Sequence, residues 1–223
     1  SEAYIEECVS IRTELCRDHP ETYEPDLADS YNNLAELYRS TRRFKESEAM
    51  HKSALAIRER LAKNNPQVYE PDLADSYNNL AALYSDTQRF EECEAIHKSA
   101  LAIRERLAKD KPQAYEPDLA DSYNNLANLY GDTKRFKESE AMYKSALAIR
   151  ERLAKGNSQA YEPDLAGSYN NLAILYSDTQ RFAESEAMHK SALAIYERLA
   201  KDNPQAYEPY LAQSYNNLAN LYS

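Results

Sequence analysis

Pairs of adjacent asparagines recur five times in this 223-residue chain, each pair 46 residues after the one before. A side-chain amide donates and accepts hydrogen bonds at once, which suits the main chain of an extended peptide. Asparagine is a mediocre helix former, so mid-helix pairs lower stability unless they make other interactions. The candidate peptide contacts are Asn32/Asn33, Asn78/Asn79, Asn124/Asn125, Asn170/Asn171 and Asn216/Asn217.

Each pair lies within the octet Tyr-Asn-Asn-Leu-Ala-x-Leu-Tyr, one copy of which is residues 77–84. Tyr, Leu, Ala and Tyr fall at i, i+3, i+4 and i+7, the spacing of one helix face. At about 100° per residue, the second asparagine projects nearly opposite that face and away from the core. The stronger candidates for ligand contact are therefore Asn33, Asn79, Asn125, Asn171 and Asn217. The first asparagines are equally consistent with bonds between neighbouring repeats: Asn32, Asn78, Asn124 and Asn170.

The same helix face carries the side chains that differ most between repeats. Near the start of the helix these are Asp29, Asp75, Asp121, Gly167 and Gln213, and in its middle Glu36, Ala82, Asn128, Ile174 and Asn220. Near its end they are Arg39, Ser85, Gly131 and Ser177, followed by Asp86, Asp132 and Asp178. The face is acidic toward the N-terminal half, so we expect a ligand with Lys or Arg side chains. A merely solvated acidic face is the alternative.

One position of the second helix in each repeat holds histidine three times, which resembles a row of metal ligands. His51, His97 and His189 would be too far apart on stacked helices to share an ion. Tyr143 fills the same position, which favours a packing role. No paired or metal-type spacing links the cysteines, which are Cys8, Cys16 and Cys93. We expect no metal, no cofactor and a reducing, cytoplasmic compartment.

Composition argues against several classes of function. The net charge of −10 and a pI near 5.0 disfavour a nucleic acid or an anionic membrane as the main partner. No apolar run approaches the 18 or so residues that span a bilayer, and no signal peptide is seen. The chain starts in mid-repeat, so the targeting of a longer parent protein stays open. Without a phosphate loop, a nucleophile elbow or paired carboxylates, we expect no enzyme.

Residues 71–109 show how one repeat should fold. Pro71 suits the first position of a helix, where its missing N–H costs nothing. The first helix is predicted over Pro71–Asp86 and the second over about Arg89–Lys109. Thr87 is a candidate N-cap for the second helix. The predicted core residues are Leu73, Tyr77, Leu80, Ala81 and Tyr84, then Phe90, Cys93, His97, Ala100, Leu101 and Leu107.

Two further features of the repeat bear on its edges. Pro112 and Pro117 are too close for both to lie inside one regular helix, although a short extra turn between them is an alternative. Arginines lie beside the buried stripe at Arg58, Arg104 and Arg150, with Tyr196 in that place in the last unit. A long stem that covers apolar surface explains these arginines, and pairing with a loop acid is the alternative.

The fixed period predicts an all-α chain of stacked antiparallel helix pairs, with ten helices and no second domain. Residues 1–19 match a second helix, and residues 209–223 match a first helix. The complete repeats are predicted at 25–70, 71–116, 117–162 and 163–208.

These residues resemble the tetratricopeptide repeat, in its long form found in kinesin light chains. The pattern Tyr77-x-x-Leu80-Ala81-x-x-Tyr84 carries the likeness, together with Arg-Phe-x-Glu-x-Glu-Ala and Ala-Leu-Ala-Ile-Arg-Glu. Glu105 replaces the proline that ends the ordinary repeat, so the second helix should be longer. The resemblance implies a right-handed α-solenoid whose first helices line a concave groove. In related repeats the matching asparagines contact peptide main chain.

The predicted function is therefore a non-catalytic scaffold that binds a protein or an extended peptide, with a basic ligand favoured. The candidate contacts outside the asparagine pairs are Asp75, Asp121, Glu36, Asn128, Asp86 and Asp132. Tetratricopeptide modules that bind a chaperone's C-terminal carboxylate need Lys and Arg side chains in the groove. Here Arg39 is the only such side chain at the matching positions, so we do not expect that function. A different hypothesis is head-to-tail self-assembly, because a lone second helix and a lone first helix expose complementary apolar faces.

Overall fold

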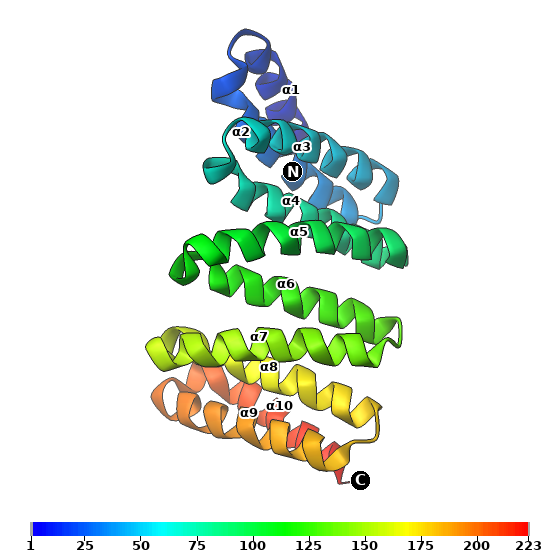
Figure 1. The fold of residues 1–223 in the computed structure, drawn as a ribbon. Helices are drawn as coiled ribbons and strands as arrows, with labels where there is room; N and C mark the ends of the chain where they lie inside the picture. The colour runs from blue at the N-terminus through cyan, green and yellow to red at the C-terminus, as the bar shows by residue number, and fades with distance from the viewer. Residues whose placement is uncertain (1, 223) are drawn as a thin grey trace. The chain divides into compact units, whose positions relative to one another are not determined.

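The computed structural model describes residues 2–222, which fold into helices joined by short turns (Figure 1). Those residues form ten α-helices and no strand. The second helices are α1 (Glu2–Asp18), α3 (Phe44–Asn64), α5 (Phe90–Asp110), α7 (Phe136–Gly156) and α9 (Phe182–Asp202). The first helices are α2 (Pro20–Ser40), α4 (Pro66–Asp86), α6 (Pro112–Asp132), α8 (Ser158–Asp178) and α10 (Pro204–Leu221).

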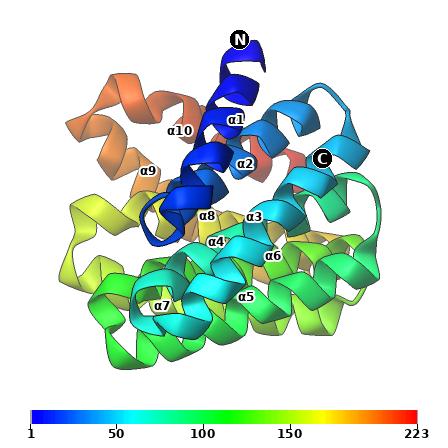
Figure 2. The same cartoon turned by 90° about the horizontal axis from the view of Figure 1, so that it is seen from above.

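The helices fall into two compact units, α1–α5 up to Lys111 and α6–α10 from Pro112. Within each unit every helix packs on the one before it, and short turns make each pair antiparallel. Figures 1 and 2 both show this for α9 and α10, which lie side by side. The prediction of an all-α chain of stacked helix pairs is confirmed, and the division into repeats remains a prediction.

First helices begin earlier than predicted: α4 starts at Pro66 rather than Pro71, and α6 at Pro112. The expectation that two prolines so close could not share one helix was wrong. Pro66 stands at the start of α4, where no N–H is needed. Pro71 lies inside α4 and removes only the bond to the carbonyl of the exposed Gln67. Solvent can reach that carbonyl, so one helix holds both prolines.

The turn between the two helices of a repeat also corrects a prediction. Thr87 ends α4 instead of capping α5, and its hydroxyl donates to the Leu83 carbonyl at 2.9 Å. Gln88 then adopts the left-handed conformation, with φ of 57°. The amide of Arg89 donates to the Tyr84 carbonyl at 2.8 Å, so a Schellman motif ends the helix. The second helix consequently begins at Phe90 and ends at Asp110, one residue later than predicted at each end.

The core of each unit lies between the two rows of helices. Among the predicted core residues, those that are buried are Leu73, Leu80, Ala81, Tyr84, Cys93, His97, Ala100 and Leu107. Three are only partly buried: Tyr77, Phe90 and Leu101. The prediction missed Leu83, which is 1% exposed, and Ser76, also 1% exposed. Both lie off the Tyr-Leu-Ala-Tyr stripe, which shows that first helices are buried on a wider arc than that stripe.

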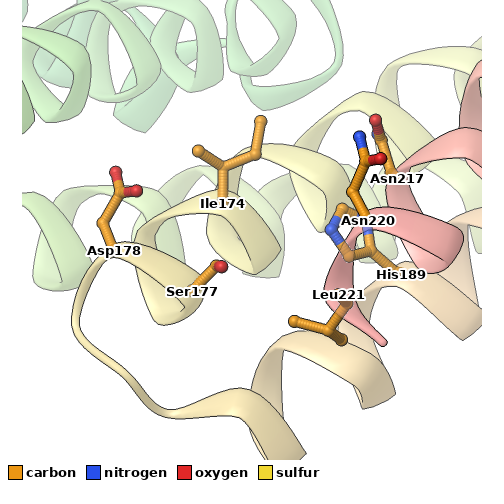
Figure 3. A pocket seen from close by; sticks show the side chains of 7 residues that line it. All are labelled: Ile174, Ser177, Asp178, His189, Asn217, Asn220 and Leu221. Atoms are coloured by element: carbon orange, nitrogen blue, oxygen red, sulfur yellow. The ribbon is translucent and has the colours of Figure 1, made fainter. Parts of the chain in front are cut away.

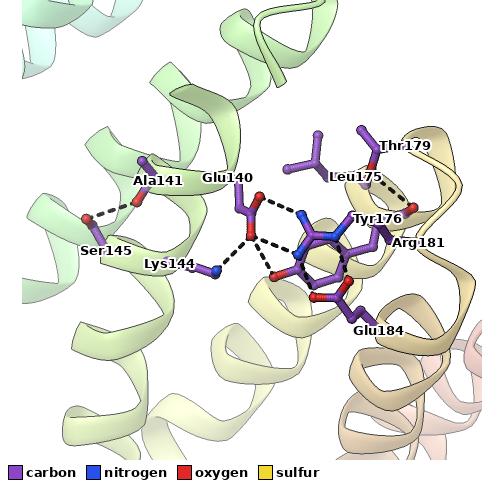
Figure 4. Close-up of polar contacts among 9 residues, drawn as sticks. All are labelled: Glu140, Ala141, Lys144, Ser145, Leu175, Tyr176, Thr179, Arg181 and Glu184. Atoms are coloured by element: carbon purple, nitrogen blue, oxygen red, sulfur yellow. Dashed lines mark hydrogen bonds and ion pairs between the residues drawn. The ribbon is translucent and has the colours of Figure 1, made fainter. Parts of the chain in front are cut away.

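A carboxylate on the second helix ties it to the repeat that follows. Glu140 of α7 accepts hydrogen bonds from Arg181 Nη1 at 2.6 Å and from the Tyr176 hydroxyl at 3.1 Å (Figure 4). The Arg181 guanidinium also lies over the Tyr176 ring, 4.1 Å from its centroid. Lys144 adds an ion pair at 2.7 Å. The hydrogen bond from Arg181 is the main cause that lowers the pKa of Glu140 to about 2.

Acid should loosen this contact. Because its pKa is depressed in the folded protein, Glu140 contributes stability above its ordinary pKa of 4.5, and that contribution is lost as pH falls toward 2. We expect Glu140→Gln to lower the free energy of unfolding by about 1–2 kcal/mol at neutral pH. Urea denaturation at several pH values should show that the free energy of unfolding falls less steeply toward low pH in this variant than in the wild type. The exposed Glu91→Gln on α5 serves as control, and an unchanged pH dependence in Glu140→Gln would contradict the assignment.

Candidate functional site

In the first four pairs the first asparagine faces other helices, whereas Asn216 is exposed. Asn32 accepts a hydrogen bond from His51 Nδ1 at 3.1 Å and donates to Ser76 Oγ of the next first helix at 3.1 Å. Asn170 contacts His189 Nδ1 at 3.1 Å in the same way. Asn78 lies beside His97, and Asn124 accepts from the next repeat. These contacts support the interpretation that the first asparagines join helices.

The second asparagines lie on the surface of the first helices and are about as exposed as the first asparagines in three of the pairs. Asn33 is exposed, and the partly buried members are Asn79, Asn125, Asn171 and Asn217. Asn171 Nδ2 donates to Asn124 Oδ1 at 2.8 Å, so one member links α8 to α6. Asn217 Oδ1 accepts from Gln213 at 2.8 Å. Each of these amides keeps further donors or acceptors that a ligand can meet.

Most predicted acidic contacts of the first unit have a cation nearby. Asp75 pairs with Arg104 at 2.5 Å, and Asp29 pairs with Arg58. In the second unit Asp121 pairs with Arg150. The guanidinium groups are buried while the carboxylates are exposed, so the arginine stem packs against the core and its head reaches helix acids rather than loop acids.

The last repeat replaces this ion pair by stacked rings. Tyr196 stands in the place of Arg150, and Gly167 in the place of Asp121. The Tyr196 ring stacks on Tyr210 of α10 with centroids 5.6 Å apart and planes 14° apart. Tyr210 in turn stands in the place of Asp164, so all three positions change together. The chain therefore joins neighbouring helices at this point in two ways, by an ion pair or by stacked rings.

The space between two successive first helices, next to the side chain at the histidine position of the second helix between them, will be called the slot. In the slot between α2 and α4, Arg39 bonds Glu36 at 2.9 Å and Asp86 at 2.7 Å. His51 Nε2 lies 3.4 Å from Glu36 beneath this network. The predicted contacts Glu36 and Asp86 therefore fill their own slot with an internal ion-pair network.

The slot between α6 and α8 is filled differently. Tyr143 is buried there and its hydroxyl donates to Asn128 Oδ1. Burial, helped by the charges of Asp132 and Asp178, raises the pKa of Tyr143 to about 12. Both aspartates therefore place negative charge near this slot.

The slot between α8 and α10 is open and forms a pocket of about 180 Å³ (Figure 3). Figure 3 shows α8 side chains on one side and α10 side chains on the other, with the imidazole next to Asn220. The pocket is lined by Ile174, Ser177, Asp178, His189, Asn217, Asn220 and Leu221. Five of these are variable or asparagine positions that the sequence pattern placed on one helix face. Sequence reasoning missed the pocket, although Ile174 and Ser177 stand where the first complete repeat has Glu36 and Arg39.

The histidines serve packing in this structure. Burial lowers the pKa of His97 to about 4, with Arg104 adding to the effect, and burial also lowers the pKa values of His51 and His189. These rings are therefore neutral at neutral pH. The part of the chain that is described holds no cluster of three His, Cys, Asp or Glu side chains fit for a metal ion. None of its helices combines the length and apolarity that a membrane crossing needs.

Family comparisons agree with this architecture. A tetratricopeptide repeat model matches residues 72–152 and 118–198, and another matches residues 27–67. The chain belongs to the tetratricopeptide repeat family. Among curated proteins, none matches this tetratricopeptide repeat chain.

Three crystal structures resemble the tetratricopeptide repeat chain. BtubC (BKLC) from P. vanneervenii has a TM-score of 0.78 and 26% identity, covering 99% of this chain and 81% of that one. A Podosopora anserina protein described as a kinesin light chain with nearly identical TPR-like repeats has a TM-score of 0.62 and 19% identity, with 89% of each chain covered. The apo form of RapI has a TM-score of 0.61 and 17% identity, covering 78% of this chain and 57% of that one. The predicted kinesin-light-chain-like tetratricopeptide array is confirmed. Such arrays are typically non-catalytic scaffolds for protein interactions.

Proposed function

We propose that this tetratricopeptide repeat protein binds an extended peptide along the exposed face of its first helices. The observation that carries the proposal is the open pocket between α8 and α10, where side chains that vary between repeats gather around one hollow. A scaffold with nearly identical repeats can distinguish partners only through positions that differ. Asn217, the second asparagine that lines the pocket, supplies an amide suited to peptide main chain.

The ligand is basic on this proposal. The chain carries a net charge of −10, and the carboxylates of Asp132 and Asp178 lie near the Tyr143 slot of the second unit. A ligand with Lys or Arg side chains would gain from both the long-range field and these carboxylates. Its binding should therefore weaken as salt is raised.

The asparagines provide the direct test. We expect Asn125→Ala with Asn171→Ala to keep helicity and to weaken binding of a library-selected peptide about tenfold, the loss of one or two hydrogen bonds. Fluorescence anisotropy at low and high salt measures the affinity, and circular dichroism measures helicity. Asn64→Ala, an exposed asparagine at the end of α3, is the matched control. Unchanged affinity in the double variant, or tighter binding of acidic peptides, would overturn the proposal.

A second candidate function is head-to-tail association. Tyr222 on α10 is 65% exposed, whereas its equivalents Tyr84 and Tyr176 are 5% and 4% exposed beneath the next second helix. On α1, Tyr4 and Ile11 are exposed as well. The α1 face of a second copy could cover α10 as the internal second helices do. Light scattering over a concentration series decides, because a strict monomer at high concentration removes this candidate.

A further inference from the structure

The three slots described above are filled by different side chains. Between α2 and α4 the filler is the guanidinium of Arg39, and between α6 and α8 it is the ring of Tyr143. Between α8 and α10 the chain supplies neither, because Ser177 replaces the arginine and His189 replaces the tyrosine. Side chains of the protein thus fill two of these three slots, and the third forms the pocket.

The open pocket is too small for a cofactor and fits a single side chain. Its volume of about 180 Å³ lies below the 300–1,000 Å³ of typical small-molecule sites. Ile174, which is 50% exposed, and Leu221 provide apolar walls. A long side chain could lay its aliphatic stem along them.

The polar side chains of the pocket offer acceptors on both walls, beside the donors of the Ser177 hydroxyl and the asparagine amides. His189 Nδ1 donates to Asn170 Oδ1, so its remaining nitrogen, Nε2, is an acceptor in the neutral ring. Ser177 and the amides of Asn217 and Asn220 add oxygens, and Asp178 adds a full negative charge. No lysine or arginine lines this hollow.

We propose that the pocket between α8 and α10 holds an arginine side chain of the bound peptide. A guanidinium brings five N–H donors in a plane and one positive charge, which suits several acceptors on different walls better than the compact ammonium of lysine. Arg39 provides an internal precedent, because its guanidinium occupies the equivalent slot and bonds acids on both flanking helices. This inference rests on the peptide-binding function proposed above and names the ligand side chain that the pocket recognises.

The test uses a filled pocket. His189→Tyr combined with Ile174→Asn copies the Tyr143–Asn128 solution of the neighbouring repeat, so the variant should fold as that repeat does. His97→Tyr, the same exchange on α5, is the control. A display library of random peptides is selected against each protein. We expect wild type and control to enrich peptides that share one arginine, and the filled variant to lose that enrichment.

A selected peptide is then changed at its arginine. Replacement by citrulline keeps the shape but removes the charge, and should weaken binding to wild type about tenfold while changing binding to the filled variant less than about twofold. Enriched peptides without a shared arginine, or equal citrulline effects on both proteins, would overturn the arginine pocket and leave peptide binding intact. Failure of every protein to enrich any peptide would overturn the proposed function and this inference with it.

Discussion

Replacing Leu80 by alanine is expected to lower the free energy of unfolding by about 2–5 kcal/mol, because the side chain is 1% exposed and its removal leaves a cavity. Repeat arrays distribute stability over neighbouring repeats, so the loss should be strongest near α4 and α5. Urea denaturation measures the total change, and amide hydrogen exchange locates it. The equivalent Leu126 of α6, 2% exposed, should behave alike in the second unit.

Ile174→Ala is the matched control for these core variants. Ile174 lies on a first helix as Leu80 does, but half of its side chain is exposed. Its loss should change stability by no more than about 0.5 kcal/mol. Equal costs at Leu80 and Ile174 would contradict the assignment of the core to the face that carries Leu80.

Tyr196→Arg is expected to cost about 2–4 kcal/mol, although three other repeats carry arginine at this position. The variant loses the stacked contact with Tyr210 and the packing against Leu199. It also buries a guanidinium where Gly167 has replaced the aspartate that pairs with Arg150. Thermal or urea denaturation measures the loss.

The other repeats show which further substitutions should restore stability to the Tyr196→Arg variant. Adding Gly167→Asp and Tyr210→Asp to Tyr196→Arg rebuilds the ion pair of the other repeats. We expect the triple variant to recover at least about 1 kcal/mol, a coupling typical of side chains in direct contact. A triple variant less stable than Tyr196→Arg alone would show that the three positions are independent.

Periodicity made much of the fold predictable. The Tyr-Leu-Ala-Tyr spacing identified first helices, and Leu80 and Ala81 are buried as that spacing requires. The place of the histidines in the packing followed from Tyr143, because a position that accepts both ring types is defined by space rather than by coordination.

The exact helix ends and the pocket did not follow from periodicity. A local rule places the helix start at Pro71, because it cannot tell that Pro66 begins the helix. Residue type alone suggests Thr87 as a cap, because a Schellman turn with glutamine in place of glycine leaves little sign in the sequence. The pocket was missed because a void is defined by what the helix on each side lacks, here a filler at Ser177 and at His189.

The slots also separate recognition from folding. Their contents change from Arg39 to Tyr143 to an open pocket, while the alanines at the helix crossings remain fully buried in both units. A substitution at an exposed slot residue, such as Ile174, can therefore alter what is bound while these crossings stay packed. Duplicating one repeat and then editing two or three slot residues would give a gene a new binding preference in a few mutational steps, with each intermediate still folded.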